Sequence, residues 1–408
     1  MIAPAAELTP SHRSRWFILG YGAAQAGAFI CFIPLLTLLL PGKAELLGGA
    51  DKALLLSQMA ILGGLTAAFA NLLFGGLSDR TRGRFGRRRP WILAGVALVA
   101  VALALIGWAR SPLQLALGVV AFQLAVNALY APLTAIVPDM VADAQKGLIS
   151  AWAGAALPVA NLFTAVVVTR LAGSPPLQFT VVIAVAAAMI LPFALTLREP
   201  RSLRPVAAPR RLSFAALKDR RFFWTFISRL LVESAVAINT LYLLFLLQDL
   251  PGARPQGWSA LQLFGGLLLA STVAAALGGF VGGVGSDRLR RRRIFVIVGG
   301  VGMAAALALM VICPAWPGPL AGQLLFGAAH GLHATTVAAM TAEILPDRAA
   351  AGRDLGVMNM AVALPQSLAP AGAAVLLGLG LPLAAVFLAA SVAALIAAAV
   401  LAPLKRLG

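Results

Sequence analysis

The chain has 408 residues, of which 61% are hydrophobic and 11% are charged, and its mean hydropathy is +0.92. Soluble domains have an apolar share of about 45–50%, so this composition excludes an ordinary soluble enzyme. Lys and Arg number 32 against 14 Asp and Glu, a net charge of +18 that in a soluble protein indicates a nucleic-acid partner.

Apolar runs long enough to cross a bilayer recur along the whole chain. A run of about 18 or more apolar residues indicates a transmembrane helix, and these runs lack the alternation typical of a membrane β-barrel. The first run is too long for the apolar part of a signal peptide, so we expect it to be retained. We therefore predict an all-α polytopic membrane protein with twelve transmembrane helices. The predicted spans are 16–40, 53–77, 91–109, 112–137, 147–171, 177–197, 222–248, 258–284, 294–313, 318–342, 354–379 and 382–402.

The basic residues are distributed unequally between the two ends of these spans. With the amino terminus placed in the cytoplasm, 26 of the 32 Lys and Arg fall in cytoplasmic segments, five lie on the opposite face, and only Arg229 lies deep within a span. By the positive-inside rule we expect both termini in the cytoplasm. Arginines in short loops face lipid headgroups, so we expect membrane lipids, and not nucleic acid, as partners. The preference for Arg and Ala is typical of a GC-rich bacterial genome, which indicates a bacterial inner membrane.

Two short signals occur twice with the same separation. Asp287, after the eighth span, lies 208 residues beyond Asp79, which follows the second span in a similar Gly-rich segment. Asp139 and Asp347, each preceded by proline, are also 208 residues apart. A duplicated six-span unit explains both signals, as in transporters built from two pseudo-symmetric halves. The predicted parts are an N-terminal six-helix half at 1–198, a cytoplasmic linker at 199–221 and a C-terminal six-helix half at 222–408.

The loop after the second span carries a recognisable motif. The stretch from Ser78 to Trp91, SDRTRGRFGRRRPW, resembles the loop motif of glycoside–pentoside–hexuronide cation symporters and sucrose-transporter-like proteins of the major facilitator superfamily. The segments Val137–Asp139 and Gly352–Gly356 are also similar to the sucrose-transporter-like branch. This resemblance implies the major facilitator fold and alternating access, coupled to protons or sodium ions, with sugars as the common substrate class.

In the family this loop stabilises the outward-facing state by bridging helices. A carboxylate at the end of a span can pair with loop arginines, or cap a helix N-terminus, in one conformation only. The alternative is that such charges only fix topology and contact lipid, which is our interpretation of Arg82, Arg84, Arg87–Arg89 and Arg290–Arg293. The candidate gating residues are Asp79, Arg80, Asp139, Asp287, Arg288, Asp347 and Arg353.

Ionisable side chains inside the predicted spans are rare, and charge there is costly and therefore a sign of function. Arg229 and Glu233 are four residues apart in the seventh span, so the guanidinium can reach the carboxylate. Counted from Phe222, Glu233 lies about 16 Å deep, close to the midplane. We expect Glu233 to take up the coupling proton and Arg229 to bias its protonation or contact the solute. A static buried ion pair is the alternative.

Two histidines lie on one side of the tenth span, His330 and His333. Imidazoles can relay protons or hydrogen-bond sugar hydroxyls, so His330 is a coupling candidate and both are solute-binding candidates. The alternative is that each bonds to a neighbouring helix. Because no third ligand accompanies them, we expect no metal, and no cofactor besides the coupling ion.

In the superfamily the first, fourth, seventh and tenth helices line the central cavity, and polar residues concentrate in these spans and in the eleventh. A neutral polyhydroxyl solute needs paired donors and acceptors of this kind. For each residue the alternative is a bond between helices, worth about 0.6 kcal/mol. The candidate solute-binding residues are Tyr21, Gln25, Gln123, Asn127, Tyr130, Asn239, Tyr242, His330, His333, Asn359 and Gln366.

These observations predict a secondary active transporter, and not an enzyme, that carries a sugar or a similar small polyhydroxylated solute with H⁺ and acts as a monomer. Na⁺ is the less favoured ion, because the second span lacks the carboxylates of melibiose-type sodium symporters in the family. The alternative is proton-driven export of an amphipathic or drug-like compound, which one buried Glu and 7% aromatic residues disfavour. A membrane-embedded receptor or enzyme is the remote alternative, since no Gly-x-Ser-x-Gly or His-Glu-x-x-His motif occurs.

Overall fold

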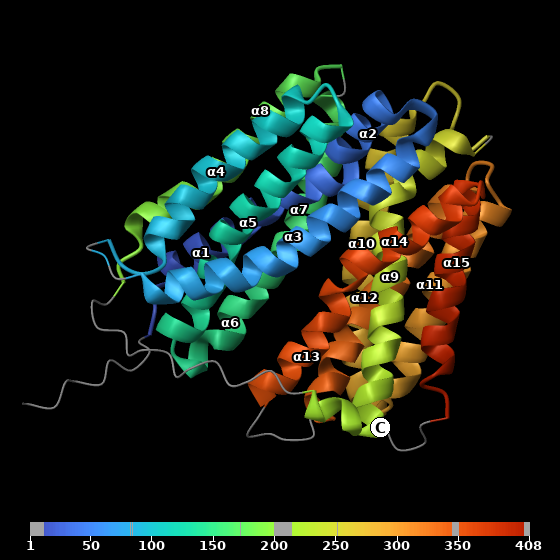
Figure 1. Cartoon of the computed structure of the whole chain (residues 1–408). Helices are drawn as coiled ribbons and strands as arrows, with labels where there is room; N and C mark the ends of the chain where they lie inside the picture. The colour runs from blue at the N-terminus through green and yellow to red at the C-terminus, as the bar shows by residue number, and fades with distance from the viewer. Residues whose placement is uncertain are drawn as a thin grey trace, which may run out of the picture. The chain divides into compact units, whose positions relative to one another are not determined.

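The structure, a computed structural model, is built from α-helices (Figure 1). Among the residues it describes there is no β-strand, only an isolated bridge between Gly83 and Gly86. The predicted all-helical architecture is therefore confirmed for this part of the chain. The described residues are 12–81, 83, 85–171, 173–199, 214–250, 252–344 and 351–403.

The helices before the predicted linker follow the apolar runs of the sequence. They are α1 (Arg15–Pro34), α2 (Leu40–Gly48), α3 (Lys52–Arg80), α4 (Arg89–Trp108), α5 (Pro112–Met140), α6 (Asp143–Gly154), α7 (Ala156–Val166) and α8 (Pro175–Thr196). The short turns between them are the π-helix η1 (Leu35–Leu39) and the 3-10 helices η2 (Gly49–Asp51) and η3 (Val168–Leu171).

The helices after the linker begin with the short η4 (Ala215–Lys218). They continue as α9 (Arg220–Asp249), α10 (Ala260–Leu289), α11 (Arg292–Ile312), α12 (Gly318–Glu343), α13 (Ala351–Ala363), α14 (Pro365–Gly378) and α15 (Leu383–Ala399).

All twelve predicted spans are helical, but not all meet the length and composition expected of a membrane span. Nine stretches of the described residues do so, which supports a multi-pass membrane protein. The first two predicted spans fall in one such stretch, Arg15–Arg80, and α15 is shorter, with 17 residues. α12 is not among the nine, and it carries the two histidines, whose polarity lowers its hydropathy. The count of twelve stays a prediction.

Proline and glycine account for the breaks within the predicted spans. The π-helix η1 follows directly after Pro34, whose missing N–H disturbs the hydrogen bonding of the helix. α2 ends at Gly48, and the next residue, Gly49, has a φ of 53°, a positive value that glycine adopts without strain. The eleventh predicted span consists of α13 and α14, and Pro365 begins the second of these, where no N–H is needed.

Contacts divide the chain into two compact units, which differ from the predicted halves. Unit 1 comprises Met1–Leu35, Leu65–Thr164 and Gly173–Pro209, and unit 2 comprises Leu36–Gly64, Ala165–Ala172 and Arg210–Gly408. The differences are residues 36–64 and 165–172, which group with the C-terminal helices because their contacts are there. The division into halves at 1–198 and 222–408 stays a prediction.

Unit 1 is organised around two packed helix pairs. α1 packs against α8, and α4 packs against both α5 and α8. Phe193 of α8 contacts Phe17 and Tyr21 of α1 edge to face, with ring centroids 5.4 Å and 5.8 Å apart. At Gly95 of α4 an added Cβ would lie 2.7 Å from Leu129 of α5, so only glycine permits this close approach.

Unit 2 has α12 near its centre, packed against α10 and α11, while α15 packs against α9 and α11. Small residues let α10 and α12 approach closely, as at many helix interfaces in membranes. A Cβ at Gly331 of α12 would overlap the carbonyl oxygen of Ala275 of α10, and one at Gly278 would overlap that of Ala328. This interface positions the histidines of α12.

We expect Gly331→Ala to lower the free energy of unfolding by about 1–3 kcal/mol, because the methyl group must push α10 and α12 apart. Thermal or denaturant unfolding in detergent micelles measures the change. The control is Gly372→Ala in α14, where an added Cβ meets no atom within 4 Å and where alanine favours the helix. Equal effects of the two substitutions would contradict the packing of α10 on α12.

Candidate functional site

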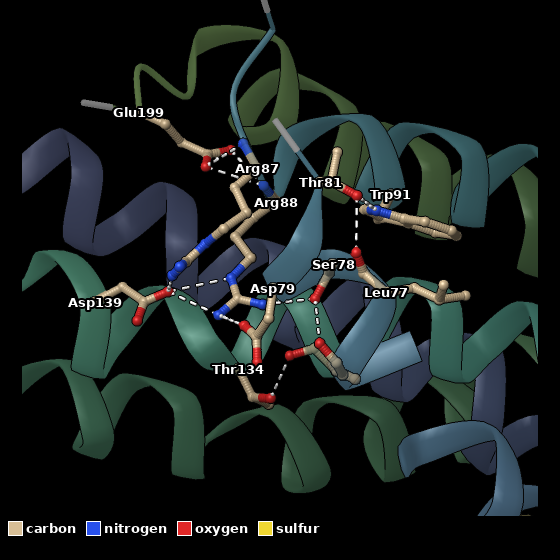
Figure 2. Close-up of polar contacts among 12 residues, drawn as sticks. Leu77, Ser78, Asp79, Thr81, Arg87, Arg88, Trp91, Thr134, Asp139 and Glu199 are labelled. Atoms are coloured by element: carbon tan, nitrogen blue, oxygen red, sulfur yellow. Dashed lines mark hydrogen bonds and ion pairs between the residues drawn. The ribbon is translucent and has the colours of Figure 1, made fainter. Parts of the chain in front are cut away.

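A group of charged side chains gathers at one end of unit 1, and we call it the arginine cluster. It combines the last turn of α3, the segment before α4, the end of α5 and Glu199, which lies three residues beyond the end of α8. Figure 2 shows these side chains pointing toward one another. The members are Ser78, Asp79, Arg87, Arg88, Asp139 and Glu199.

Arg88 is the centre of this cluster and is 4% exposed. Its guanidinium donates to Asp139 Oδ2 from Nε at 3.1 Å and from Nη2 at 2.9 Å. It also donates to Asp79 Oδ1 at 2.6 Å and to Ser78 Oγ at 2.5 Å (Figure 2). Arg87 adds a second guanidinium to Asp139, with Nη2 2.5 Å from Oδ2. Each nitrogen of the Arg88 guanidinium donates a hydrogen bond, which a buried ion pair needs to be stabilising, whereas Arg87 Nε is buried without a partner among the described residues.

Glu199 closes the N-terminus of α4. Its carboxylate accepts hydrogen bonds from the backbone N–H groups of Arg87 at 2.7 Å, Arg88 at 2.8 Å and Arg89 at 2.6 Å. The first N–H groups of a helix have no partner within the helix and attract an anion. Gly86, with φ of 93°, makes room, because a Cβ there would lie 2.7 Å from the Glu199 carboxyl carbon.

Only two of the three predicted gating residues of the first half lie in the arginine cluster. Asp79 and Asp139 lie in the arginine cluster, whereas Arg80 is exposed and forms no ion pair among the described residues. Arg87 and Arg88, which we had assigned to topology, hold the two carboxylates instead. The sequence contains the signal for this in Pro90, a residue typical of the first turn of a helix, because it identifies the preceding arginines as the start of α4.

The corresponding residues of the second half form a looser arrangement. Arg292 pairs with Asp287 and with Glu343, each at 2.9 Å. Both carboxylates are more than half exposed, so water screens these pairs and they contribute little. Arg288 is exposed. Outside the described residues lie Asp347 and the side chain of Arg353.

The buried charge cluster is our name for Arg229 and Glu233 on α9 with His330 and His333 on α12, all within unit 2. Arg229 lies within electrostatic range of Glu233, and His333 within range of both Arg229 and His330. Within the described part of the chain, Arg229 and Glu233 form no ion pair at 4.0 Å or less. The direct ion pair that the spacing of Arg229 and Glu233 allows is therefore not formed, and the roles predicted for these residues and for the two histidines stay predictions.

Two nitrogens of this cluster are buried without a hydrogen-bond partner among the described residues. They are Arg229 Nε and His333 Nε2, and His333 is 1% exposed. His330 stacks on Phe326, with ring centroids 6.2 Å apart. Buried polar atoms normally have partners, so each exception calls for an explanation. In this part of the chain no group of three or more His, Cys, Asp or Glu side chains is placed to hold a metal ion.

Three of the predicted solute-binding residues meet inside unit 1, and we call them the tyrosine cluster. Gln25 Nε2 donates to Tyr21 Oη at 2.6 Å, and both residues are buried. Tyr130 of α5 lies within electrostatic range of Tyr21 and packs edge to face on Phe29, with ring centroids 5.9 Å apart. The cluster therefore offers phenol and amide groups beside an aromatic face.

Asn127 of α5 instead joins helices. It accepts a hydrogen bond from Asn71 of α3 at 3.3 Å and donates to the backbone oxygen of Gln123 at 2.8 Å. Gln123 itself is buried. These bonds match the alternative that we gave for such residues, a polar contact between helices.

The remaining candidates lie in unit 2 and are not gathered into one site. Asn239 of α9 accepts a bond from Gln323 of α12 at 2.7 Å. Tyr242 and Ser57 share a hydrogen bond of 2.5 Å between α9 and α3. Both thus join helices. Asn359 is exposed and Gln366 is half-buried.

A fourth polar group, which the sequence analysis did not predict, lies at the C-terminal end of α9 within unit 2. We call it the lysine cluster. Lys52 at the start of α3 donates to Gln248 Oε1 at 2.7 Å and lies 3.5 Å from Asp249 and 3.7 Å from Glu45. Its ammonium group also sits over the Phe245 ring, 4.8 Å from the centroid. Gln248 in turn donates to Glu45 at 3.0 Å, so α2, α3 and α9 are linked.

Comparisons with known proteins agree with this helical architecture. The sequence profile of the Major Facilitator Superfamily matches residues 19–370 and 253–407. The General alpha-glucoside permease of Schizosaccharomyces pombe is 31% identical over 118 residues, which cover 25% of this chain and 21% of that relative. The chain thus matches only about a fifth of the length of this relative.

Several solved structures share the fold at low sequence identity. A variant of the nucleoside transporter NupG superposes with a TM-score of 0.75 at 13% identity, covering 96% of this chain and 100% of that one. A variant of the peptide transporter POT, in complex with alafosfalin, gives 0.74 at 13%, covering 96% and 94%. A bacterial homologue of the human lysosomal transporter Spinster, inward-facing and unoccupied, gives 0.70 at 17%, covering 96% and 97%. At these identities the likeness concerns the fold alone.

We expect Arg88→Gln to destabilise the protein by about 3–5 kcal/mol, because it leaves the carboxylates of the arginine cluster short of a buried partner. Denaturant unfolding in detergent micelles measures this loss. Arg80→Gln is the control, since Arg80 is exposed two residues after Ser78, and we expect a change within about 0.5 kcal/mol. A larger effect at Arg80 than at Arg88 would overturn this assignment.

Proposed function

The chain belongs to the major facilitator superfamily and is a secondary transporter rather than an enzyme, and we propose that it carries a sugar or similar polyhydroxylated solute in symport with H⁺. The observation that carries this proposal is the buried charge cluster. It places one carboxylate, Glu233, inside an apolar helix without an ion pair among the described residues. Alternating access in the bacterial inner membrane, with both termini in the cytoplasm and the monomer as the functional form, is part of the same proposal.

Glu233 suits proton uptake for an electrostatic reason. A carboxylate in a membrane interior is costly when charged and unpaired, and it becomes tolerable when it is protonated or when a cation approaches. Arg229 lies within electrostatic range one helical turn away. Small movements of the guanidinium therefore change the cost of the charged form, which is what coupling a proton to a conformational change requires.

The tyrosine cluster supports a polyhydroxylated solute. Tyr21, Gln25 and Tyr130 present donors and acceptors near the Phe29 ring, and such a combination fits hydroxyl groups on a partly apolar sugar face. The short match to a relative named as an alpha-glucoside permease points to the same substrate class.

The two remaining clusters fit the gates of an alternating-access cycle. The arginine cluster lies at the end of α3 and α5 that we assign to the cytoplasm, and its buried ion pairs hold those ends together with α4. The lysine cluster lies at the C-terminal end of α9, which we assign to the external side. There Lys52 holds α3 to Gln248 and Asp249. We propose that its bonds break when the external side opens.

We expect Glu233→Gln to abolish solute accumulation driven by an inward pH gradient, because the amide cannot take up a proton. Liposomes that contain the protein and a pH-sensitive dye, exposed to mono- and disaccharides, measure both proton entry and uptake. Exchange of solute across the membrane without a gradient should continue in the variant, since binding and alternation remain.

The matched control is Glu343→Gln, which removes an exposed acid from α12 and should leave coupled uptake unchanged. Coupled uptake that survives Glu233→Gln with the same pH dependence would contradict the role of Glu233. Expulsion of an amphipathic probe, with no sugar moving protons, would replace symport by export.

For the lysine cluster we expect Lys52→Gln to favour the externally open state. Losing about 1 kcal/mol of ion-pair energy shifts the equilibrium between the externally closed and externally open states about fivefold. The reporter is Ala60→Cys, a buried position of α3, in a Cys313→Ser background that leaves only the buried Cys31. Labelling by a membrane-impermeant maleimide should become about fivefold faster.

Arg170→Gln is the control for this measurement, because Arg170 is exposed at the end of η3 and lies outside the lysine cluster. It should label at the rate of the parent protein. Unchanged labelling in Lys52→Gln, or a similar increase in Arg170→Gln, would show that the lysine cluster is not the gate.

A further inference from the structure

The surface at the turn between α10 and α11 combines exposed arginines with exposed apolar side chains, and it lies outside the arginine, buried charge, tyrosine and lysine clusters. We propose that this turn binds an anionic phospholipid, with the lipid phosphate on the arginines and the acyl chains along α10 and α11. The proposal goes beyond a general contact of loop arginines with headgroups, because it assigns one class of lipid to one site. It depends neither on the solute nor on the coupling ion.

The first observation is the charge of this turn. Residues 287–293, with the sequence DRLRRRR, contain five arginines and one aspartate. Arg288, Arg290 and Arg291 are exposed, and their side chains form no hydrogen bond or ion pair with any residue that the structure describes. Three guanidinium groups on one turn are therefore open to a ligand.

The acids that the structure places next to this turn are already engaged. Arg292 Nη2 lies 2.9 Å from Asp287 Oδ1, and its Nη1 lies 2.9 Å from Glu343 Oε1. Arg293 donates to the backbone oxygen of Ala402 at 2.9 Å. Because Arg292 takes both of these carboxylates, an anion from outside the chain can serve the three exposed arginines.

The corresponding loop of the first half uses its arginines differently. Arg87 and Arg88, just before α4, are largely buried and are held by Asp139, and Arg88 also by Asp79. Arg290 and Arg291, just before α11, are exposed instead. The repeated motif thus directs its guanidinium groups to the chain itself in unit 1, whereas in unit 2 it presents three of them to the surroundings.

The second observation is the position of these arginines on their helices. On α10, Leu277 and Val281 precede Arg288 by 11 and 7 residues, spacings that place the three side chains on one face of the helix. All three are exposed. This face is therefore apolar along the helix and ends in a positive charge.

α11 has the same arrangement on the other side of the turn. Ile294 and Val298 follow Arg291 by three and seven residues, again on one face, and both are exposed. The two helices meet next to the turn, where a Cβ at Gly285 would lie 2.8 Å from the Phe295 ring. Two neighbouring helices thus each carry exposed apolar side chains up to an exposed arginine.

The dimensions of this surface fit one leaflet of a bilayer. From Leu277 to Arg288, α10 rises about 17 Å, and half of the hydrocarbon core of a bilayer is about 15 Å thick. An acyl chain along the apolar face therefore brings the lipid phosphate to the level of the arginines. Guanidinium groups form paired hydrogen bonds with phosphate, and their net positive charge favours an anionic headgroup over a zwitterionic one.

The experiment uses the full chain, freed of lipid in a mild detergent, and measures bound lipid by native mass spectrometry. The probes are palmitoyl-oleoyl-phosphatidylglycerol and the phosphatidylcholine with the same chains. We expect the phosphatidylglycerol to bind at least tenfold more tightly. The triple substitution Arg288→Gln, Arg290→Gln and Arg291→Gln should remove most of this preference, because each basic residue at a membrane surface strengthens the binding of an anionic lipid about fivefold.

The matched control removes the same charge from other turns. Arg110, Arg170 and Arg254 are exposed and lie outside the turn between α10 and α11. The triple substitution of these three residues to Gln should leave the preference for phosphatidylglycerol unchanged.

A second measurement locates the acyl chain and leaves the arginines in place. A fluorophore is attached to Leu277→Cys in the Cys313→Ser background, in phosphatidylcholine vesicles with a minor share of brominated lipid. Brominated phosphatidylglycerol should quench it more strongly than brominated phosphatidylcholine, and less so at about 1 M salt, where the Debye length is about 3 Å. The control is Val392→Cys, an exposed position of α15, which has no charged residue. Both lipids should quench it equally.

The outcomes decide which ligand occupies the turn. Equal binding of the two lipids, or an unchanged preference in the Arg288, Arg290 and Arg291 variant, would overturn the proposal. Displacement of the lipid by soluble glycerol 3-phosphate would assign the turn to a free phosphate compound. A dimer that this variant alone fails to form would assign it to a second copy of the chain. If the variant does not fold, the quenching at Leu277→Cys decides, and equal quenching by the two lipids there would overturn the proposal.

Discussion

A bilayer offers no hydrogen-bond partners, so every polar group that enters it must find one within the chain or in a ligand, and this constraint explains most of the structure. It makes every apolar run helical, and it turns isolated polar side chains into bonds between helices, as between Gln323 and Asn239 or Ser57 and Tyr242. Arg229 stands out against this background. Its environment is equally apolar, but its hydrogen bonding is incomplete among the described residues.

Under the proposed function, the polar clusters have different tasks in the transport cycle according to their position. Buried ion pairs around Arg88 hold one end of α3, α4 and α5 within unit 1. In unit 2, α9 carries Arg229 and Glu233 in its middle and Gln248 near its end. Under the proposed function, the groups that take proton and solute and the groups that hold the external end closed lie on one continuous helix, whereas the arginine cluster is separate from it.

The sequence predicted the helices well, because hydropathy and the lack of water in a bilayer fix them together. It also located Asp79 and Asp139, since both recur in the second half. It did not predict their partners. Glu199 accepts a hydrogen bond from the N–H of Arg89, 110 residues away in the chain, and Lys52 donates one to Gln248, 196 residues away. A polar side chain within a span indicates that it has a hydrogen-bond partner. Whether that partner is a neighbouring helix, as for Tyr242, or a solute depends on how the helices pack.

The length of α9 has a mechanical meaning. From Glu233 to Gln248 the helix rises about 22 Å, so under the proposed function a tilt of α9 about Glu233 would move the far end of the helix much more than its middle. A tilt of about 5° at Glu233 would displace the far end by about 2 Å, which is enough to stretch the 2.7 Å bond between Gln248 and Lys52 beyond hydrogen-bond distance. A rearrangement too small to repack the helix at its centre would thus be amplified into the loss of a contact at its tip.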